Sequence, residues 1–271
     1  MGNGNDNWRP MALVTGASSG IGREFARQLA ARGHDVLLVS NQEKELDETA
    51  TELAISNPEG NFPTFFIDLT MPDADTRLLD FCRNNGYEIG VLVNNAGIFS
   101  FCPVVGTPAG RIDLFIDLHI TAVTHLCRTF ALDMKQRRCR GYILNMSSMS
   151  CWMPMPGIAM YSATKAYIRV FSRALAVELA DDGITVMVAC PGGIATDLFG
   201  LPRKLQRLGV RLGVLATPQR FVRGALKHLF RHRRQYINGF VNRPAIVAVA
   251  SLPHSFRRAI KHHLLDKIGK P

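Results

Sequence analysis

The chain has 271 residues, of which 47% are hydrophobic, so it is long enough for one large α/β domain with a sizeable core. Its net charge of +10 is unevenly distributed: residues 1–202 hold 16 Lys and Arg against 21 Asp and Glu, whereas residues 203–271 hold 16 against one. The basic C-terminal quarter lacks the interleaved aromatic residues of nucleic-acid-binding modules, so we expect no nucleic-acid partner.

Targeting and redox features are sparse. Residues 1–10 contain no apolar core of a signal sequence and form the predicted N-terminal tail. The sequence has no unbroken run of about 18 apolar residues, so we predict no transmembrane helix. The six cysteines are scattered without CxxC spacing, which favours free thiols in a reducing compartment over a disulfide framework or a metal site. We therefore predict a cytoplasmic location and no metal.

The first predicted strand, residues 11–15, opens directly into Thr15-Gly-Ala-Ser-Ser-Gly-Ile-Gly22, and residues 21–32 have a helical pattern. This strand–turn–helix unit is typical of dinucleotide binding, although its spacing is GxxxGxG and not GxGxxG. Gly16 permits the tight turn, Gly20 lets the backbone approach a pyrophosphate, and Gly22 lets the helix pack against the strand. Ser18, Ser19 and Ile21 complete the predicted phosphate-binding loop.

A second strand is predicted at residues 35–39 and a helix at residues 42–56. An acidic residue just after this strand would accept the 2′-hydroxyl of the adenosine ribose and repel a 2′-phosphate. Ser40 and Asn41 stand there instead. Because no carboxylate repels the phosphate, we predict NADP(H) as cofactor, with NAD(H) as the alternative.

The middle of the chain continues the alternation of strand and helix. Strands are predicted at residues 62–67, 89–93 and 141–146, and helices at residues 74–85, 111–137 and 158–180. Asp68-Leu69 ends the third strand, and Asp68 also suits a turn or helix cap. Asn94-Asn-Ala-Gly97 follows the fourth strand, and Ser147-Ser148 follows the fifth.

After a sixth strand at residues 184–189 come Cys190-Pro-Gly-Gly193 and Thr196. Residues from about 195 to 216 are predicted to form a substrate lid. Thr217 and Pro218 predict a helix start, as N-cap and first helical residue, continuing to about residue 230. Residues 235–241 favour a seventh strand, and residues 243–271 form a basic C-terminal extension.

Tyr161 and Lys165 lie four residues apart in a helical segment, so their side chains share one helix face. An ammonium beside a phenol favours the phenolate, which predicts a tyrosine pKa below its usual value near ~10. Such a phenol exchanges a proton with a substrate oxygen. Most pairs at this spacing are a solvated face, but Ser148 and the glycine-rich loop favour the catalytic interpretation.

Together these four motifs resemble the classical short-chain dehydrogenase/reductase family, and the resemblance runs from about residue 11 to residue 198. It implies a single Rossmann-type domain over residues 11–271, with a doubly wound, mostly parallel seven-stranded sheet and helices on both faces. It also implies an oxidoreductase that interconverts a carbonyl and a secondary alcohol. Ser148, thirteen residues before Tyr161, would be the catalytic serine, with Ser147 as the alternative, and Lys165 would support the tyrosine.

The resemblance assigns further residues to the cofactor. Those implied to contact it are Asn41, Asp68, Leu69, Asn95, Ala96, Gly97, Tyr161, Lys165, Pro191, Gly192 and Thr196. Asn94 is expected to stabilise the sheet. The chain departs from the family at His119, where an asparagine usually holds a water in a proton relay to the lysine. Imidazole can also bind a water and pass a proton, so a relay role and a purely structural role both stay open.

The substrate is expected to be a lipophilic small molecule. The chain resembles the ketoreductases of long-chain 3-oxoacyl thioesters and the related 17β-hydroxysteroid dehydrogenases, and residues 149–157 suggest an apolar wall. The alternative is a non-catalytic dinucleotide-binding sensor or scaffold with a basic tail that binds a membrane or polyanion. The intact Ser148, Tyr161 and Lys165 set favours the enzyme. The resemblance also implies a homo-oligomer, a dimer or a tetramer.

The C-terminal extension has an amphipathic pattern over residues 254–268, with Phe256, Ile260, Leu264 and Ile268 on one side and cationic residues on the others. This pattern suits peripheral contact with an anionic membrane. A helix docked on the domain or on a second subunit explains the same pattern.

Overall fold

The computed structural model describes residues 10–194, 204, 215–239 and 242–261. Its centre is a seven-stranded sheet in the order β3-β2-β1-β4-β5-β6-β7, in which every neighbouring pair is parallel. The strands are β1 (Met11–Thr15), β2 (Val36–Ser40), β3 (Thr64–Phe66), β4 (Ile89–Asn94), β5 (Gly141–Met146), β6 (Ile184–Ala189) and β7 (Gln235–Tyr236). This confirms the predicted doubly wound α/β fold, with a described sheet that is wholly and not mostly parallel.

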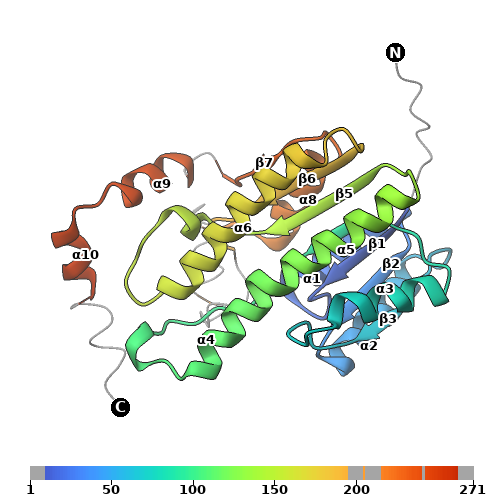
Figure 1. Ribbon diagram of the computed structural model, residues 1–271, viewed down its shortest axis with the longest axis horizontal. Helices are drawn as coiled ribbons and strands as arrows, with labels where there is room; N and C mark the ends of the chain where they lie inside the picture. The colour runs from blue at the N-terminus through green and yellow to red at the C-terminus, as the bar shows by residue number, and fades with distance from the viewer. Residues whose placement is uncertain (1–9, 195–203, 205–214, 240–241, 262–271) are drawn as a thin grey trace.

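Helices cover both faces of the sheet (Figure 1). They are α1 (Gly20–Ala30), α2 (Glu43–Ser56), α3 (Ala74–Asn84), α4 (Ala109–Ile116), α5 (Ala122–Gln136), α6 (Ala159–Glu178), α8 (Pro218–Leu229), α9 (Asn242–Ala250) and α10 (His254–Ile260). One buried cluster joins α3, α5 and α6 to one face of the sheet, and a second joins α1, α2 and α8 to the other. The central strands are buried on both faces, which explains their continuous apolar sequences.

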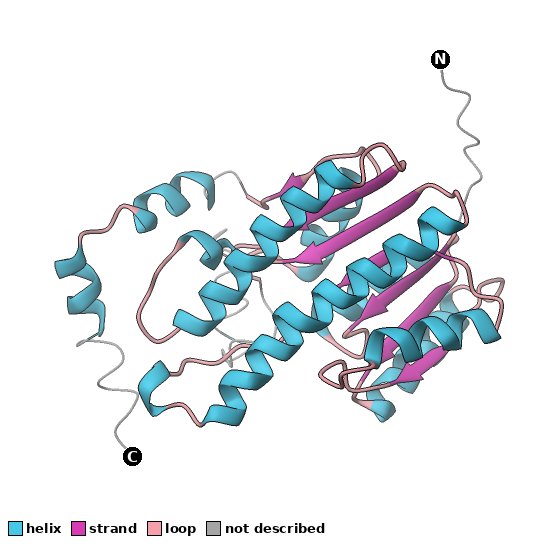
Figure 2. Ribbon diagram, in the orientation of Figure 1, coloured by secondary structure: helices cyan, strands magenta, loops and turns pink. Residues whose placement is uncertain are grey.

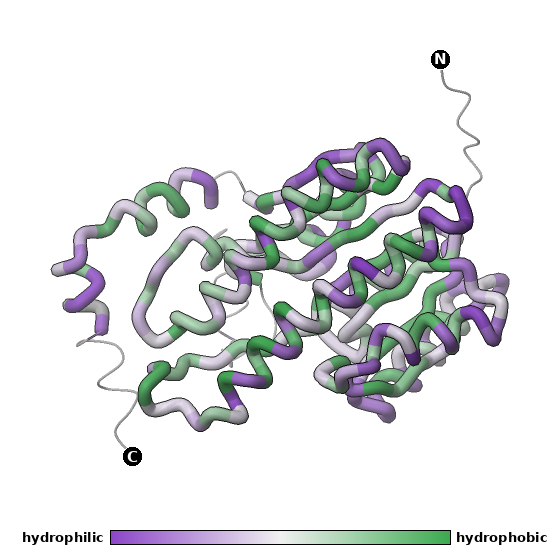
Figure 3. Tube along the Cα trace, in the orientation of Figure 1, coloured by the Kyte–Doolittle hydropathy of each residue, from purple (hydrophilic) through white to green (hydrophobic). Residues whose placement is uncertain are grey.

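Hydropathy follows this layering. The inner strands are hydrophobic in Figure 3, while hydrophilic residues gather on the outer helices and on α10. Alternate residues of one strand serve opposite cores: Leu13 packs with the α3, α5 and α6 side and Val14 with the α1, α2 and α8 side. Every strand therefore ties the two layers together.

Several boundaries differ from those predicted. β3 and β7 are shorter than expected, because both lie at the edges of the sheet, where only one neighbour defines the pairing. The start of α8 is as predicted: the Thr217 side chain accepts a hydrogen bond from the Arg220 N–H, and Pro218 is the first helical residue. The predicted lid lies almost wholly outside the described residues, as does the end of the C-terminal extension.

The predicted single helix over residues 111–137 is interrupted. A π-helical turn, Asp117–Thr121, separates α4 from α5. A π turn widens the helix locally and is common where a side chain is redirected for function. Here it carries His119, whose side chain is fully buried.

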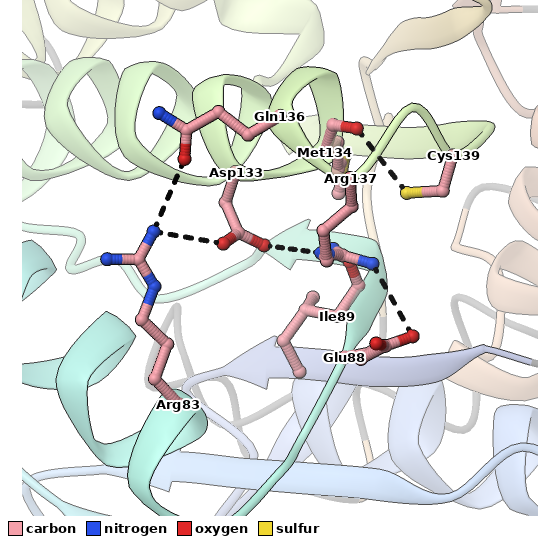
Figure 4. A network of polar contacts seen from close by, with 8 residues as sticks. All are labelled: Arg83, Glu88, Ile89, Asp133, Met134, Gln136, Arg137 and Cys139. Atoms are coloured by element: carbon pink, nitrogen blue, oxygen red, sulfur yellow. Dashed lines mark hydrogen bonds and ion pairs between the residues drawn. The ribbon is translucent and has the colours of Figure 1, made fainter.

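A charged network closes the end of the domain where the strands begin (Figure 4). Asp133 in the last turn of α5 accepts a hydrogen bond from Arg137 Nε at 2.8 Å and another from Arg83, of α3, at 3.3 Å. Arg137 also donates to the main-chain oxygen of Ile89 at the start of β4. The network fixes α3 and α5 to the sheet at the end opposite the motif residues.

Candidate active site

The motif residues meet where the carboxyl ends of the parallel strands point, as the arrowheads in Figure 2 show. The sheet order reverses between β1 and β4, and in open α/β sheets ligands bind outside the strand ends at this switch point. Thr15 joins the two strands there: its Oγ1 accepts hydrogen bonds from the N–H groups of Asn95 and Ala96, both at 3.0 Å. In return, Asn95 Nδ2 donates a hydrogen bond to the main-chain oxygen of Thr15.

The glycine-rich loop has the geometry that its spacing predicts. Gly16 and Gly20 have positive φ angles of 65° and 56°. A Cβ on Gly22 would lie 2.0 Å from the Gly16 oxygen, so only glycine lets α1 begin this close to β1. A Cβ on Gly20 would meet nothing within 4 Å, so the backbone borders open space at the start of α1.

The start of α1 fits a dinucleotide pyrophosphate. No acidic residue lies in its first turn, and its N-cap residue, Ser19, makes no side-chain capping hydrogen bond. The first N–H groups of a helix carry partial positive charge and bind phosphate oxygens when no cap occupies them. Residues 16–22 would therefore hold the phosphates, with Ile21 part-buried in the same turn.

The residues after β2 differ in exposure. Ser40 is buried, and its Oγ lies 2.9 Å from Ser18 Oγ, while Ser18 also donates to Gln42 Oε1 at 3.1 Å. Asn41 is exposed. Of the two residues considered for the adenosine ribose, only Asn41 thus faces solvent. Arg23, near the start of α1, forms an ion pair with Glu52 of α2.

Asp68 and Leu69 lie at the end of β3, as expected. Leu69 is buried in the core, and Asp68 is exposed. Asp68 Oδ1 accepts hydrogen bonds from Thr70 N–H at 2.9 Å and from Thr70 Oγ1 at 2.8 Å. Asp68 therefore forms a turn, and the N-cap position of α3 belongs to Asp73. The role of Asp68 at the adenine stays a prediction.

The two serines after β5 have different partners. Ser147 Oγ donates to the main-chain oxygen of Lys165 at 2.7 Å, which anchors α6 to the strand. Ser148 begins a 3₁₀ turn, Met149–Trp152, and its hydroxyl is near enough to the Tyr161 phenol to act on the phenol's pKa. The structure thus brings Ser148, and not Ser147, to the tyrosine, in agreement with the thirteen-residue spacing.

Tyr161 and Lys165 lie together, with Lys165 Nζ 5.7 Å from the centre of the tyrosine ring, and both are buried. Burial raises the pKa of Tyr161 to about 12, although the nearby Ser148 hydroxyl acts in the other direction. Burial also lowers the pKa of Lys165 from 10.5 to about 8. The expected lowering of the tyrosine pKa is therefore wrong for this structure, because desolvation of the buried phenolate is the largest influence on that pKa.

His119 is held on both sides of its ring. Its Nε2 accepts a hydrogen bond from Ile98 N–H at 3.1 Å, and its Nδ1 lies 3.0 Å from Thr164 Oγ1, which itself donates to the main-chain oxygen of Tyr161. This pattern requires the neutral Nδ1–H tautomer. Burial, followed by the charge of Lys165, holds the pKa of His119 well below its usual range. Both nitrogens thus have protein partners, which supports a positioning role; the relay stays a prediction.

Gly97 separates His119 from Lys165. A Cβ on this exposed glycine would lie 3.0 Å from His119 Nε2 and 3.4 Å from Lys165 Nζ. Asn94, at the end of β4, instead donates to Asn145 Oδ1 of β5 at 2.8 Å in the buried core. Asn94 therefore stabilises the sheet, as expected, while Ala96 and Gly97 continue toward the site.

Comparison with known proteins identifies the family. Residues 10–204 match the family model for short chain dehydrogenases. The chain belongs to the short-chain dehydrogenase family. It is therefore an oxidoreductase that interconverts a carbonyl and an alcohol with a nicotinamide cofactor, as the motifs indicate.

Two groups of curated short-chain dehydrogenases are similar to it. It is 32% identical to 17-beta-hydroxysteroid dehydrogenase type 3 of Danio rerio over 80% of this chain and 69% of that protein. It is 34% identical to the very-long-chain 3-oxoacyl-CoA reductase of Pyricularia oryzae over 79% of this chain and 63% of that protein. The chain thus spans about two thirds of the length of these relatives.

Solved short-chain dehydrogenases have the same fold. A short-chain dehydrogenase from Sphingobium yanoikuyae, solved in complex with NADPH, superposes with a TM-score of 0.76 at 30% identity, over 94% of this chain and 96% of that one. The bulky-bulky ketone specific alcohol dehydrogenase from Comamonas testosteroni gives 0.74 at 28% identity, over 91% and 96%.

The structure adds neighbours to this dehydrogenase site that sequence reasoning missed. The Phe99 ring meets the Tyr161 ring edge-on, with centroids 4.9 Å apart. Phe99 follows the Asn94–Gly97 motif by two residues, so an aromatic residue at this spacing is the available signal. Pro191 and Gly192 lie buried at the end of β6, and Met149 N–H donates to the Pro191 oxygen at 2.8 Å. Thr196 lies outside the described residues.

The described part of the chain contains no group of three His, Cys, Asp or Glu residues arranged to hold a metal ion. All six cysteines are free thiols.

Proposed function

We propose that this short-chain dehydrogenase reduces the carbonyl group of a lipophilic substrate with NADPH. The observation that carries the proposal is that Ser148, Tyr161 and Lys165 are buried together, with Lys165 Nζ 5.7 Å from the centre of the tyrosine ring. Burial keeps the pKa of the phenol high, so Tyr161 is protonated at neutral pH. A protonated phenol is a proton donor, which favours the reductive direction.

Each residue has a distinct task in that reaction. The dinucleotide, when bound, supplies the hydride for the carbonyl carbon. Ser148 donates a hydrogen bond to the carbonyl oxygen as negative charge develops there. Tyr161 transfers its proton to the same oxygen, and the Lys165 ammonium stabilises the phenolate that forms. Residues 16–22 hold the phosphates and thereby fix the reacting end of the dinucleotide near Tyr161.

NADP(H) is the proposed cofactor on two grounds. No carboxylate stands at Ser40 or Asn41, and a related solved dehydrogenase carries NADPH. A lipophilic substrate is supported by the apolar 3₁₀ turn Met149–Trp152 beside Ser148 and by the names of the curated relatives, which act on very-long-chain 3-oxoacyl-CoA or hydroxysteroids. NAD(H) is the alternative cofactor, and the steroid the alternative substrate.

A spectrophotometric screen tests this proposal. NADPH and NADH are each offered with long-chain 3-oxoacyl thioesters, 17-ketosteroids and small ketones, and the absorbance of the reduced cofactor is followed. We expect turnover with NADPH and a preference for the long apolar substrates. Turnover only with small polar ketones would contradict the substrate class, and dinucleotide binding without turnover on any carbonyl would favour the sensor alternative.

We also propose that α10 contacts an anionic membrane surface. Phe256 in α10 is 62% exposed, and Arg257 and Arg258 follow it in the last turn. An exposed aromatic ring beside cationic side chains suits the membrane interface. In the described part of the chain no helix is long and apolar enough to cross a bilayer. Co-sedimentation with anionic liposomes at low and high salt tests the proposal: binding lost at high salt and on deletion of residues 254–271 supports it, and unbound full-length protein refutes it.

A homo-oligomer and a cytoplasmic location are proposals too. Val170 and Val177 of α6 are about 60% exposed and lie seven residues apart on one helix face, and Leu132 of neighbouring α5 is 46% exposed. Such a face suits burial against a second copy. Light scattering after size exclusion tests the dimer or tetramer, and fractionation of cells that express the protein tests the location.

A further inference from the structure

The segment after β7 reaches back to the turn that ends β6. Asn238 is buried, and its Oδ1 accepts a hydrogen bond from Gly192 N–H at 2.7 Å. Two residues earlier, directly after β6, the main chain makes this contact itself, since Cys190 N–H donates to the main-chain oxygen of Tyr236. The Asn238 side chain thus continues the pairing of β6 with β7 where the strands separate.

A second asparagine completes the contact. Asn242, the first residue of α9, donates from Nδ2 to the main-chain oxygen of Asn238 at 2.6 Å. Its amide also packs directly on Gly192, because a Cβ there would lie 2.2 Å from Asn242 Nδ2. Gly239, between the two asparagines, has a φ of 72°, a conformation that favours glycine. We call Asn238 and Asn242 the asparagine clamp.

The clamp joins three parts of the site. The Pro191–Gly192 turn is fixed on its other side by Met149 N–H, one residue after Ser148. α9 packs against the Met149–Trp152 turn, and Ile246 of α9 is buried. The Ser148 turn, the Pro191–Gly192 turn and α9 therefore form one packed unit, and the clamp is the polar contact that fixes α9 in it.

The position of this unit determines which end of a dinucleotide it meets. The glycine-rich loop after β1 takes the phosphates, and Ser40 and Asn41 after β2 lie on the adenosine side. Tyr161 and Ser148 lie on the opposite side, after β5, so the reacting ring must point that way. The turn after β6 is the next one along the sheet, beyond Ser148.

We propose that the asparagine clamp positions the Pro191–Gly192 turn for the nicotinamide end of the dinucleotide and couples dinucleotide binding to the docking of α9. This rests on the proposed function. Because Asn242 is the first residue of α9, its contacts in the clamp require α9 to be docked, so a ligand that uses the turn stabilises docked α9. By thermodynamic reciprocity, the factor by which the ligand favours docked α9 is also the factor by which loss of docking lowers the affinity for the ligand.

Calorimetric titration of two ligands tests the proposal. NADPH reaches the clamped turn, whereas adenosine 2′,5′-bisphosphate carries only the adenosine half. Asn238→Ala and Asn242→Ala should each raise the Kd for NADPH by about threefold to tenfold, which is the equivalent of one net hydrogen bond. The Kd for the bisphosphate should not change. Val247→Ala, at a 65% exposed position of α9, is the matched control and should bind both ligands as the wild type does.

Hydrogen–deuterium exchange of the α9 amides, residues 245–250, provides the reciprocal measurement. NADPH should slow their exchange in the wild type and not in Asn242→Ala, and the bisphosphate should protect α9 in neither protein. Equal NADPH affinity in wild type and clamp variants would overturn the proposal, as would equal loss of both ligands, which indicates a merely structural role. If the wild type binds neither NADPH nor NADH, the proposed function itself fails.

Discussion

Lys165 Nζ donates a hydrogen bond to the main-chain oxygen of Met146, 3.0 Å away at the end of β5. Met146 lies two residues before Ser148 on the same segment. The ammonium that supports Tyr161 is thus attached to the strand that positions Ser148, so the proton donor and the polarising hydroxyl keep a fixed relationship. Burial lowers the lysine pKa, and this cost to stability is explained by the chemistry of the site.

We expect Lys165→Met to change how stability depends on pH. The lysine pKa is 10.5 in the unfolded chain and about 8 in the folded one, so the unfolded state binds more protons between these values. Wild-type stability relative to the variant should therefore rise from pH 8 to 10.5, by up to about 3 kcal/mol. Urea unfolding of both proteins across this range measures it, and a constant difference would refute the assigned lysine pKa.

The same lysine predicts an alkaline limit to activity. The ratio kcat/KM for the dinucleotide reports groups of the free enzyme, and it should fall above a pH of about 8 as the ammonium loses its charge. Tyr161 does not set this limit, because its pKa is about 12. Any activity kept by Lys165→Arg, which stays charged, should show no such fall. A wild-type profile that stays flat to about pH 9.5 would contradict the assignment.

Cofactor preference should respond to Asn41. Asn41→Asp places a carboxylate at the exposed position after β2, where it repels a 2′-phosphate. We expect kcat/KM to fall about tenfold or more with NADPH and to change little with NADH, while Asn41→Ser keeps the wild-type ratio. Ser40 is less suitable because it is buried against Ser18. Equal losses with both cofactors would count against the NADP(H) proposal.

Replacements at His119 separate positioning from relay. His119→Asn should stay active, and His119→Leu should lose rate, because it leaves Ile98 N–H and Thr164 Oγ1 without their partner. If the imidazole positions the site, the leucine variant raises KM for the dinucleotide and keeps the pH profile. If it relays protons, kcat falls and the pH profile changes. Equal activity of both variants would leave the histidine without either role.

The local motifs of the site could be predicted from sequence, and its long-range contacts could not. The Tyr161–Lys165 spacing fixes both side chains to one helix face, and the Gly16–Gly22 pattern follows from steric needs of a tight turn. Spacing does not report burial, however, so the direction predicted for the shift of the Tyr161 pKa is wrong. The π turn around His119 could not be predicted either, because the apolar pattern of residues 111–137 continues through it without a visible change.

The asparagine clamp shows the same limit over a longer distance. Asn238 and Asn242 lie about fifty residues after Gly192, in a segment whose pattern suggests only an edge strand and a helix. Their contact arises because β7 pairs with β6 and returns the chain to the end of that strand. Side chains that act across strands leave no periodic signal, and only the sheet order brings them together.

The activity of Tyr161→Phe, with dinucleotide binding followed by calorimetry on the same sample, tests whether Tyr161 is the proton donor. The substitution removes the phenolic oxygen and keeps the ring, which still packs against Phe99. We predict NADPH binding near the wild-type value and a fall in kcat of about 100-fold or more. A folded variant that binds NADPH and keeps near-normal kcat would contradict the assignment of Tyr161 as the proton donor.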